Sequence, residues 1–163
     1  AAFSSFANNG TYIPPTILLD RDPLADVREP RRVMSTLTSK VVVQMMREAV
    51  TSGTGRKADI PGYRVAGKTG TAEKVINGVY DHSKNMTSFA AVFPADDPKY
   101  TVLIVLDEPV SSTGRAQSAA FNSAPAVGRV IERIAPILDV MPHFEDIDTY
   151  GPNVRTISDR RAL

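Results

Sequence analysis

Apolar and polar residues repeat with helical spacing near the start of the chain. Residues 3–7 place apolar side chains on one helical face, and Asn8-Asn9-Gly10 is typical of a helix end, because Asn and Gly tolerate the left-handed conformation. From about 39 to 50, apolar residues repeat at i, i+3, i+4, i+7 and i+8, which predicts a second helix with Thr38 or Ser39 as its N-cap. The apolar positions of both helices are Phe3, Phe6, Ala7, Val42, Met45, Met46, Ala49 and Val50.

A third helix is predicted towards the C-terminal end. Ser123-Ala-Pro125 has the form of an N-cap with proline in the first helical turn, and the helix should end near Pro136. Its apolar face consists of Val127, Val130, Ile131, Ile134 and Ala135. Residues 139–163 are polar and aperiodic, so we expect a loosely attached tail.

The middle of the chain has the patterns of strands. Residues 63–75 lack helical periodicity and are rich in Val, Thr and Gly, and the following Asn77-Gly78 favours a hairpin turn. Two further strands, 88–93 and 100–106, are separated by a short turn bounded by prolines, which predicts an antiparallel pair. The apolar middle of 100–106 is typical of a strand that is buried on both faces.

The order helix, helix, three antiparallel strands, helix predicts an α+β fold, in which an antiparallel sheet packs against helices. Residues 20–35 and 110–118 have the composition of loops. We expect residues 1–138 to form one packed body and 139–163 to be its tail. The chain begins Ala1-Ala2-Phe3, without methionine and in what reads as the end of a helix, so we expect it to be a piece of a longer protein.

Composition narrows the class of protein. The 163 residues are 42% hydrophobic and 23% charged, which is typical of a single globular domain. The 19 Lys and Arg residues nearly balance 18 Asp and Glu residues, so we expect no nucleic-acid partner. There is no apolar run of about 18 residues, so no membrane span is expected within the chain. The absence of cysteine excludes disulfides and cysteine nucleophiles and fits an oxidising compartment.

The stretch from Gly62 to Thr69 matches the phosphate-loop pattern G-x-x-x-x-G-K-[ST]. This pattern binds phosphate when a strand precedes the first glycine and a helix begins at the lysine. Here Asp-Ile-Pro precedes Gly62, and Gly70 lies where the helix should begin. We therefore expect no nucleotide binding.

Lys68-Thr69-Gly70-Thr71 also has the form of the K-T-G-T strand motif of serine acyl-transferases of the penicillin-binding type. Lysine would place positive charge beside a substrate carboxylate, and both threonine hydroxyls could hydrogen-bond to that carboxylate. Glycine would let a substrate approach and pair with the strand, where a backbone N–H could serve as an oxyanion donor. The alternative is a solvated charge at Lys68 and a β-bulge at Gly70.

Around this motif, residues 1–138 resemble the C-terminal half of the transpeptidase domain of class B penicillin-binding proteins. The matching segments are Phe6–Tyr12, Val41–Val50, Gly53-Thr-Gly55, Gly62–Lys74, Ser88–Pro94 and Leu103–Pro109. The resemblance implies the α+β fold of the penicillin-binding and serine β-lactamase-like enzymes. The stretch Ala72-Glu-Lys-Val-Ile-Asn-Gly78 is most similar to the cell-division (septal) branch.

The resemblance implies a peptidoglycan D,D-transpeptidase. In this family a serine attacks the D-Ala-D-Ala carbonyl of a stem peptide and expels the last D-Ala, and the acyl group then passes to an amine of a neighbouring stem. The family implies that Lys68 is catalytic, that Thr69, Gly70 and Thr71 bind substrate, and that the Thr71 backbone N–H contributes to the oxyanion hole. It implies no cofactor and no metal.

The resemblance also implies partners and a location. The partners would be stem peptides ending in D-Ala-D-Ala, β-lactams that trap the acyl-enzyme, the upstream part of the same protein, and membrane proteins of the division complex. The intact protein would be anchored in the inner membrane and face the periplasm.

Two further motifs of the family are not found where the family has them. No lysine is preceded at the third position by serine, so the chain lacks S-x-x-K, which supplies the nucleophile and the general base. Ser83-Lys84-Asn85 has the form S-x-N but follows K-T-G instead of preceding it, so we interpret it as a loop or turn. We expect both motifs upstream of Ala1 and expect the chain by itself to be inactive. The alternatives are a non-catalytic sensor of peptides or β-lactams and a related serine hydrolase, such as a β-lactamase or D,D-carboxypeptidase.

The two histidines, His82 and His143, have no metal-ligand partner at helical or turn spacing. We interpret both as exposed loop residues. Ser88, His82 and Asp81 contain the residue types of a catalytic triad, but closeness in sequence is not triad geometry.

Overall fold

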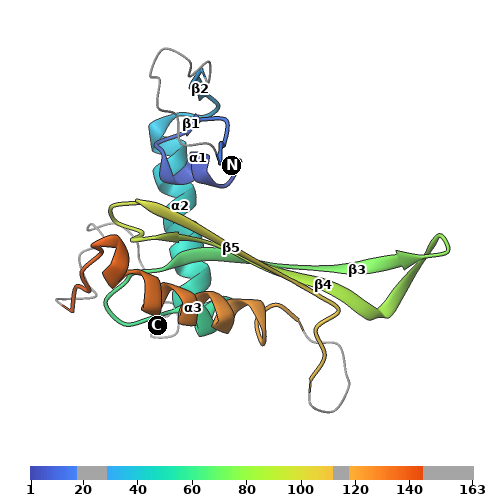
Figure 1. Ribbon diagram of the computed structural model, residues 1–163. Helices are drawn as coiled ribbons and strands as arrows, with labels where there is room; N and C mark the ends of the chain where they lie inside the picture. The colour runs from blue at the N-terminus through green and yellow to red at the C-terminus, as the bar shows by residue number, and fades with distance from the viewer. Residues whose placement is uncertain (18–28, 112–117, 145–163) are drawn as a thin grey trace, which may run out of the picture.

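The computed structural model describes residues 1–17, 29–111 and 118–144. Along these residues the elements are α1 (Ser4–Ala7), β1 (Thr11–Tyr12), β2 (Arg31–Arg32), α2 (Thr36–Thr51), the 3₁₀ turn η1 (Arg56–Ala58), β3 (Ala66–Ile76), β4 (Val79–Phe93), β5 (Tyr100–Asp107), α3 (Ser123–Ile134) and the 3₁₀ turn η2 (Pro136–Leu138). The predicted α+β fold, with an antiparallel sheet packed against helices, is confirmed (Figure 1).

The main sheet has the strand order β3-β4-β5, and both pairs are antiparallel, as predicted. Asn77 and Gly78 have positive φ angles of 52° and 81° between the paired residues Ile76 and Val79. This is the geometry that a two-residue hairpin turn requires. Because β4 begins at Val79 and not near Ser88, β3 and β4 form a long arm that projects from the body of the molecule (Figure 1).

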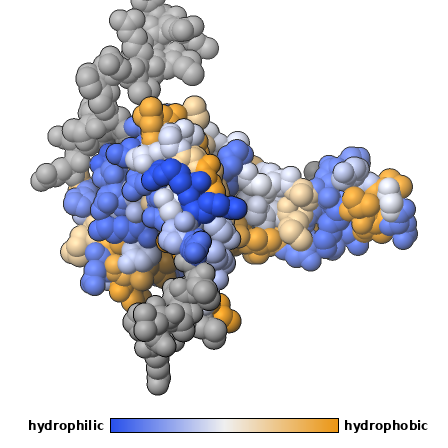
Figure 2. Space-filling view, turned by 90° about the horizontal axis from the view of Figure 1, so that it is seen from above, coloured by the Kyte–Doolittle hydropathy of each residue, from blue (hydrophilic) through white to orange (hydrophobic). Residues whose placement is uncertain are grey.

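The end of this arm carries both hydrophilic and hydrophobic surface (Figure 2). Its exposed apolar side chains are Val75, Ile76, Val79 and Tyr80. A shift in register between Glu73 and Lys74 separates the arm from the regular part of the sheet. The Lys74 ammonium lies 2.7 Å from an Asp107 carboxylate oxygen and 2.8 Å from one of Glu108, so the base of the arm is tied to the end of β5.

Helices pack on both faces of the sheet, because successive residues of a strand point to opposite faces. On one face, α2 covers the start of β3 and the end of β4, and the buried residues there are Val43, Met46, Ala66 and Val92. On the opposite face lies a larger cluster between the sheet and α3, which includes Phe89, Ala91, Phe93, Val127 and Ile131. The last turn of α2 joins this cluster through Val50. The first half of β3 is therefore covered by α2, and α3 lies on the opposite face of the sheet against β4 and β5.

Both long helices have different caps from those predicted. α2 begins after Ser35, whose Oγ accepts a hydrogen bond from the Thr38 N–H at 3.0 Å, so the prediction of Thr38 or Ser39 as N-cap is wrong. The first turn of α2 is exposed and lies outside the apolar repeat, whereas Ser39 is buried and donates its hydroxyl to a carbonyl of α1. α3 is capped by Asn122, which accepts from the Ser123 N–H at 2.5 Å, and not by Ser123.

The buried stripe of α2 also differs from the predicted one. Val43 is buried, whereas Met45 is largely exposed. The run of three valines at 41–43 allows two helical stripes with similar spacing, and packing against β3 selects the stripe through Val43.

The prediction that β5 is buried on both faces is wrong for the described residues. Leu103 is 62% and Val105 is 49% exposed, whereas Val102 and Ile104 pack against the cluster beneath α3. The two sets alternate along the strand, so one face of β5 is covered by α3 and the other is open within the described part of the chain.

The residues after 138 are not all loosely attached. Val140 is buried in the core, and the His143 N–H donates to the Gly62 carbonyl at 2.9 Å.

The predicted loop 20–35 contains β2, which pairs with β1. The parts of the predicted tail and loops that lie outside the described residues are 145–163, 20–28 and 112–117. The boundary at 138 stays a prediction.

Candidate active site

The K-T-G-T motif lies in the first half of β3, so its predicted position on a strand is confirmed. The strand is extended through Lys68, and Gly62 lies in a turn with a φ of 85°, so a phosphate loop followed by a helix is not formed. Among the described strands β3 has only β4 as a neighbour, and the backbone groups along its outer edge are available for pairing.

Lys68 and Thr69 point to opposite faces of β3, but the lysine side chain returns to its neighbour. The Lys68 ammonium donates to the Thr69 carbonyl at 2.9 Å and to the Thr69 hydroxyl at 3.4 Å. Lys68 is exposed, so this ammonium is accessible from solvent. The motif therefore brings a cationic donor and a hydroxyl together at an accessible position on β3.

Thr69 has a second partner that the sequence analysis did not identify as a site residue. Its hydroxyl lies 2.9 Å from the Thr54 hydroxyl, and either can be the donor. Thr54 follows α2 and lies between two glycines, and the Gly55 N–H donates to the Ala49 carbonyl at 2.9 Å. A Cβ at Gly55 would lie 3.0 Å from that carbonyl oxygen and 3.2 Å from Phe89, so the close fit of this turn favours glycine. The Gly-Thr-Gly pattern at residues 53–55 was the sequence feature that could have indicated a role for Thr54.

Thr71 is connected to the start of α3. Its hydroxyl accepts a hydrogen bond from the Ala119 N–H at 3.2 Å and keeps its own proton to donate. Directly across on β4, Thr87 is fully buried and donates to Asn122 Oδ1 at 2.8 Å. The two threonines of the motif are thus oriented from different sides, Thr69 by the segment after α2 and Thr71 by the segment before α3.

Gly70 is in regular register with Ser88, and the register shift lies further along, between Glu73 and Lys74. The alternative interpretation of Gly70 as a β-bulge is therefore wrong. A Cβ at Gly70 would lie 2.5 Å from the Ser88 hydroxyl oxygen. The absence of a side chain at 70 thus accommodates the serine across the strand pair.

Ser83-Lys84-Asn85 lies within β4 beside the shift in register, so its interpretation as a loop or turn is wrong. The Ser83 N–H and hydroxyl both donate to Asp81 Oδ1, at 2.9 and 2.6 Å, and these hydrogen bonds lower the pKa of Asp81. The segment forms part of the arm instead of facing Lys68 from another element.

His82 is 83% exposed, as predicted, but it belongs to β4 and not to a loop. Its Nδ1 lies 2.8 Å from Glu73 Oε1, and this hydrogen bond with the carboxylate raises the pKa of His82. The partner of His82 is thus Glu73, and no Ser-His-Asp arrangement with Ser88 and Asp81 is formed. His143 is exposed. The described residues contain no group of three or more His, Asp or Glu side chains that could hold a metal ion.

Residues 1–126 match the sequence family described as the penicillin binding protein transpeptidase domain. The chain belongs to this family. The chain is 46% identical over 154 residues to the probable peptidoglycan D,D-transpeptidase FtsI of Caulobacter vibrioides, an alignment that covers 85% of the chain. It is 35% identical over 160 residues to stage V sporulation protein D of Bacillus subtilis, with 91% of the chain covered.

Solved structures have the same fold. The transpeptidase domain of Burkholderia pseudomallei penicillin-binding protein 3 superposes with a TM-score of 0.73 at 32% identity, over 87% of this chain and 42% of that one. Penicillin-binding protein 3 of Mycobacterium tuberculosis in complex with ampicillin superposes with a TM-score of 0.75 at 31% identity, over 90% of this chain and 35% of that one.

This transpeptidase domain is only partly represented in the chain. The chain spans about a quarter of the length of the two curated relatives, 25% of the Caulobacter protein and 24% of the Bacillus protein. Among the described residues, no helix has the length and apolar character needed to span a membrane.

Proposed function

We propose that the chain supplies the substrate-binding strand of a peptidoglycan D,D-transpeptidase that cross-links stem peptides during cell division. The observation that carries this proposal is the position of the Lys68 ammonium beside the Thr69 hydroxyl on an accessible strand of the sheet. Membership of the penicillin-binding transpeptidase family and the likeness to FtsI support it.

The four motif residues have separate roles in this proposal. Lys68 provides positive charge near the nucleophile, and the Thr69 and Thr71 hydroxyls donate to the substrate carboxylate. The Thr71 backbone N–H contributes to the oxyanion hole, which stabilises the charge that develops on the attacked carbonyl oxygen. Gly70 leaves the backbone of β3 accessible to an extended peptide, which would pair with the strand edge.

The nucleophile belongs to the upstream part of the protein. The serine oxygen bonds to the penultimate D-Ala carbonyl carbon, the peptide bond to the last D-Ala breaks, and that D-Ala leaves with the proton from the serine. An amine of a neighbouring stem peptide then attacks the ester, gives up a proton and releases the serine, which forms the cross-link. The reaction needs neither a metal nor a cofactor.

The proposed setting is the periplasmic face of the inner membrane, with the membrane anchor upstream. The likeness to a probable peptidoglycan D,D-transpeptidase and the absence of cysteine support a cell-wall enzyme in an oxidising compartment. We propose stem peptides, β-lactams, the upstream segment and division-complex membrane proteins as partners. Residues 139–163 are proposed to follow the transpeptidase domain as its tail.

Labelling with a fluorescent penicillin tests this function. We expect the intact protein to form a covalent adduct, and Lys68→Ala to lower the second-order rate of acylation by about 100-fold or more, because it removes a charge next to the reacting atoms. Lys99→Ala is the matched control, since Lys99 is exposed and forms an ion pair with Asp97 on the same turn. The chain without its upstream part should not be labelled, because it lacks the nucleophile. An adduct on the isolated chain, or normal acylation of Lys68→Ala, would contradict the proposal.

A further inference from the structure

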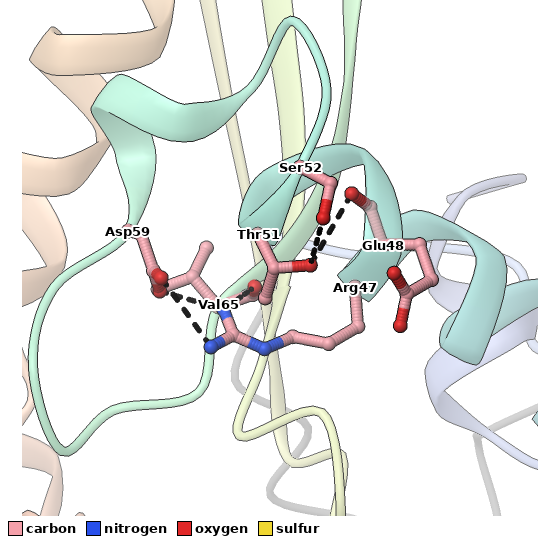
Figure 3. Close-up of polar contacts among 6 residues, drawn as sticks. All are labelled: Arg47, Glu48, Thr51, Ser52, Asp59 and Val65. Atoms are coloured by element: carbon pink, nitrogen blue, oxygen red, sulfur yellow. Dashed lines mark hydrogen bonds and ion pairs between the residues drawn. The ribbon is translucent and has the colours of Figure 1, made fainter. Parts of the chain in front are cut away.

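Arg47 joins three segments that are separate in the sequence. From the last half of α2, its guanidinium points towards Asp59 and the Val65 carbonyl (Figure 3). Nη1 lies 2.6 Å from Asp59 Oδ1 and 2.8 Å from the Val65 carbonyl oxygen, and Nη2 lies 3.4 Å from Asp59 Oδ2. The guanidinium therefore connects α2, the residue that follows η1, and the residue that precedes β3.

This contact is partly buried and specific in its geometry. The side chains of Arg47 and Asp59 are 14% and 35% exposed, and Val65 is fully buried. A planar guanidinium can donate to a carboxylate through two nitrogens and to a carbonyl at the same time, whereas a lysine ammonium cannot reproduce this arrangement. The contact thus fixes both the distance and the orientation of its partners.

The segment between Arg47 and its partners carries a member of the candidate site. The connection from α2 to β3 (residues 52–65) begins at the end of the helix and contains Thr54, whose hydroxyl lies 2.9 Å from that of Thr69. Arg47 holds the far end of this connection at Asp59 and Val65. Val65 is only three residues before Lys68, so Arg47 also fixes the start of β3 relative to α2. Thr54 and Thr69 thus lie on the two segments whose relative position Arg47 helps to fix.

We propose that Arg47 is a positioning residue for substrate binding. By holding the 52–65 connection and the start of β3 against α2, it brings the hydroxyls of Thr54 and Thr69 into one arrangement that receives the substrate carboxylate. Arg47 itself does not touch the substrate. This inference rests on the proposed function, because it assigns Thr69 to carboxylate binding.

Saturation kinetics of acylation in the intact protein test this inference. The variants are Arg47→Lys and Asp59→Asn, and the matched control is Asp97→Asn, since Asp97 pairs with Lys99 on a turn outside the 52–65 connection. With a fluorescent penicillin, the final amplitude counts correctly folded active sites, and the dependence of the rate on penicillin concentration reports binding. We expect Arg47→Lys to raise the half-saturating concentration about 10-fold without lowering the amplitude, because small displacements of binding groups have large effects on reactivity. The control should change neither quantity.

A second experiment separates positioning from general stabilisation. In a Thr54→Ala background, Arg47→Lys should have much less effect on the half-saturating concentration, because the group that it positions is gone. A lower amplitude or melting temperature with unchanged kinetics per active site would show that Arg47 only stabilises the fold and would overturn the inference. If Arg47→Lys does not fold, Asp59→Asn gives the same readout with the Arg47–Val65 contact kept. Failure of the unmodified intact protein to label at all would overturn the proposed function and this inference with it, whereas normal labelling with unaffected variants would overturn this inference alone.

Discussion

Thr87 is a buried hydroxyl directly across the strand pair from Thr71. Its Oγ1 donates to Asn122 Oδ1 at 2.8 Å and lies 2.8 Å from Ser123 Oγ. Buried polar groups are stable when they have hydrogen-bond partners, and this group joins the middle of β4 to the cap of α3. A single hydroxyl thereby links the helix start to the strand that supports the K-T-G-T motif.

Thr87→Val should therefore destabilise the protein, although it hardly changes the volume of the side chain. We expect the free energy of unfolding to fall by about 1–3 kcal/mol, because Asn122 and Ser123 each lose a buried partner. Urea unfolding of the intact protein, followed by circular dichroism, measures this loss. Thr101→Val on β5, where the side chain is only partly buried, is the control and should change the stability by less than about 0.5 kcal/mol. Equal effects of both substitutions would show that the hydroxyl of Thr87 has no special role.

At the scale of secondary structure, the β3–β4 arm is the feature that departs most from a regular sheet. The register of the β3–β4 pair shifts after Glu73, and such irregularities commonly bend a strand pair and increase its twist. Ion pairs from Lys74 to Asp107 and Glu108 lie on one side of this shift, and they raise the pKa of Lys74. The His82–Glu73 contact spans the shift itself. The orientation of the arm thus depends on charged contacts instead of a packed core.

The His82–Glu73 contact should depend on pH. The Glu73 carboxylate raises the pKa of His82 above its ordinary value of 6.5, so the contact stabilises the arm at lower pH and is lost as the pH rises through the raised pKa. An NMR titration of the His82 ring should show this raised pKa, and Glu73→Gln should return it towards the ordinary value. Asp97→Asn removes a carboxylate elsewhere and should leave the His82 titration unchanged. A His82 titration that is insensitive to Glu73→Gln would refute the ion pair.

At the scale of the whole molecule, the sheet has one face that is only partly covered by the described residues. α3 covers one side of β5, whereas Leu103 and Val105 on the other side remain largely exposed. On the face that carries Leu103 and Val105, α2 covers the sheet only near Ala66 and Val92. An exposed apolar surface on a sheet favours association with another protein segment. The upstream part of the intact protein is the segment that we propose covers it.

The chain by itself should therefore self-associate. We expect its apparent mass in sedimentation velocity or size-exclusion experiments to rise with protein concentration, because association buries the face that carries Leu103 and Val105. Leu103→Lys should shift the chain towards the monomer, and Leu37→Lys, at a position on the first turn of α2 that is at least as exposed, is the control. A concentration-independent monomer would contradict this expectation.

Much of the fold could be predicted from local patterns. The Asn77-Gly78 turn, the three antiparallel strands and the α3 helix follow from short-range preferences of the backbone and from apolar spacing, which operate over a few residues. The K-T-G-T motif could be placed on a strand for the same reason. The caps at Ser35 and Asn122 and the choice of Val43 over Met45 were missed, because they depend on packing between elements and not on local spacing.

The amino-acid order alone was thus sufficient to assign the family, the class of fold and the four residues of the motif, since these depend on residue identity and short spacings. Folding in three dimensions added the contacts around that motif. Thr54 meets Thr69 across 15 residues of chain, and Arg47 meets Asp59 and Val65 across 12 and 18. Such contacts are created when α2 packs against β3, and no periodicity along the chain encodes them. Tertiary packing also decided the burial of β5, because the described elements cover only one of its faces although its apolar sequence predicted burial on both.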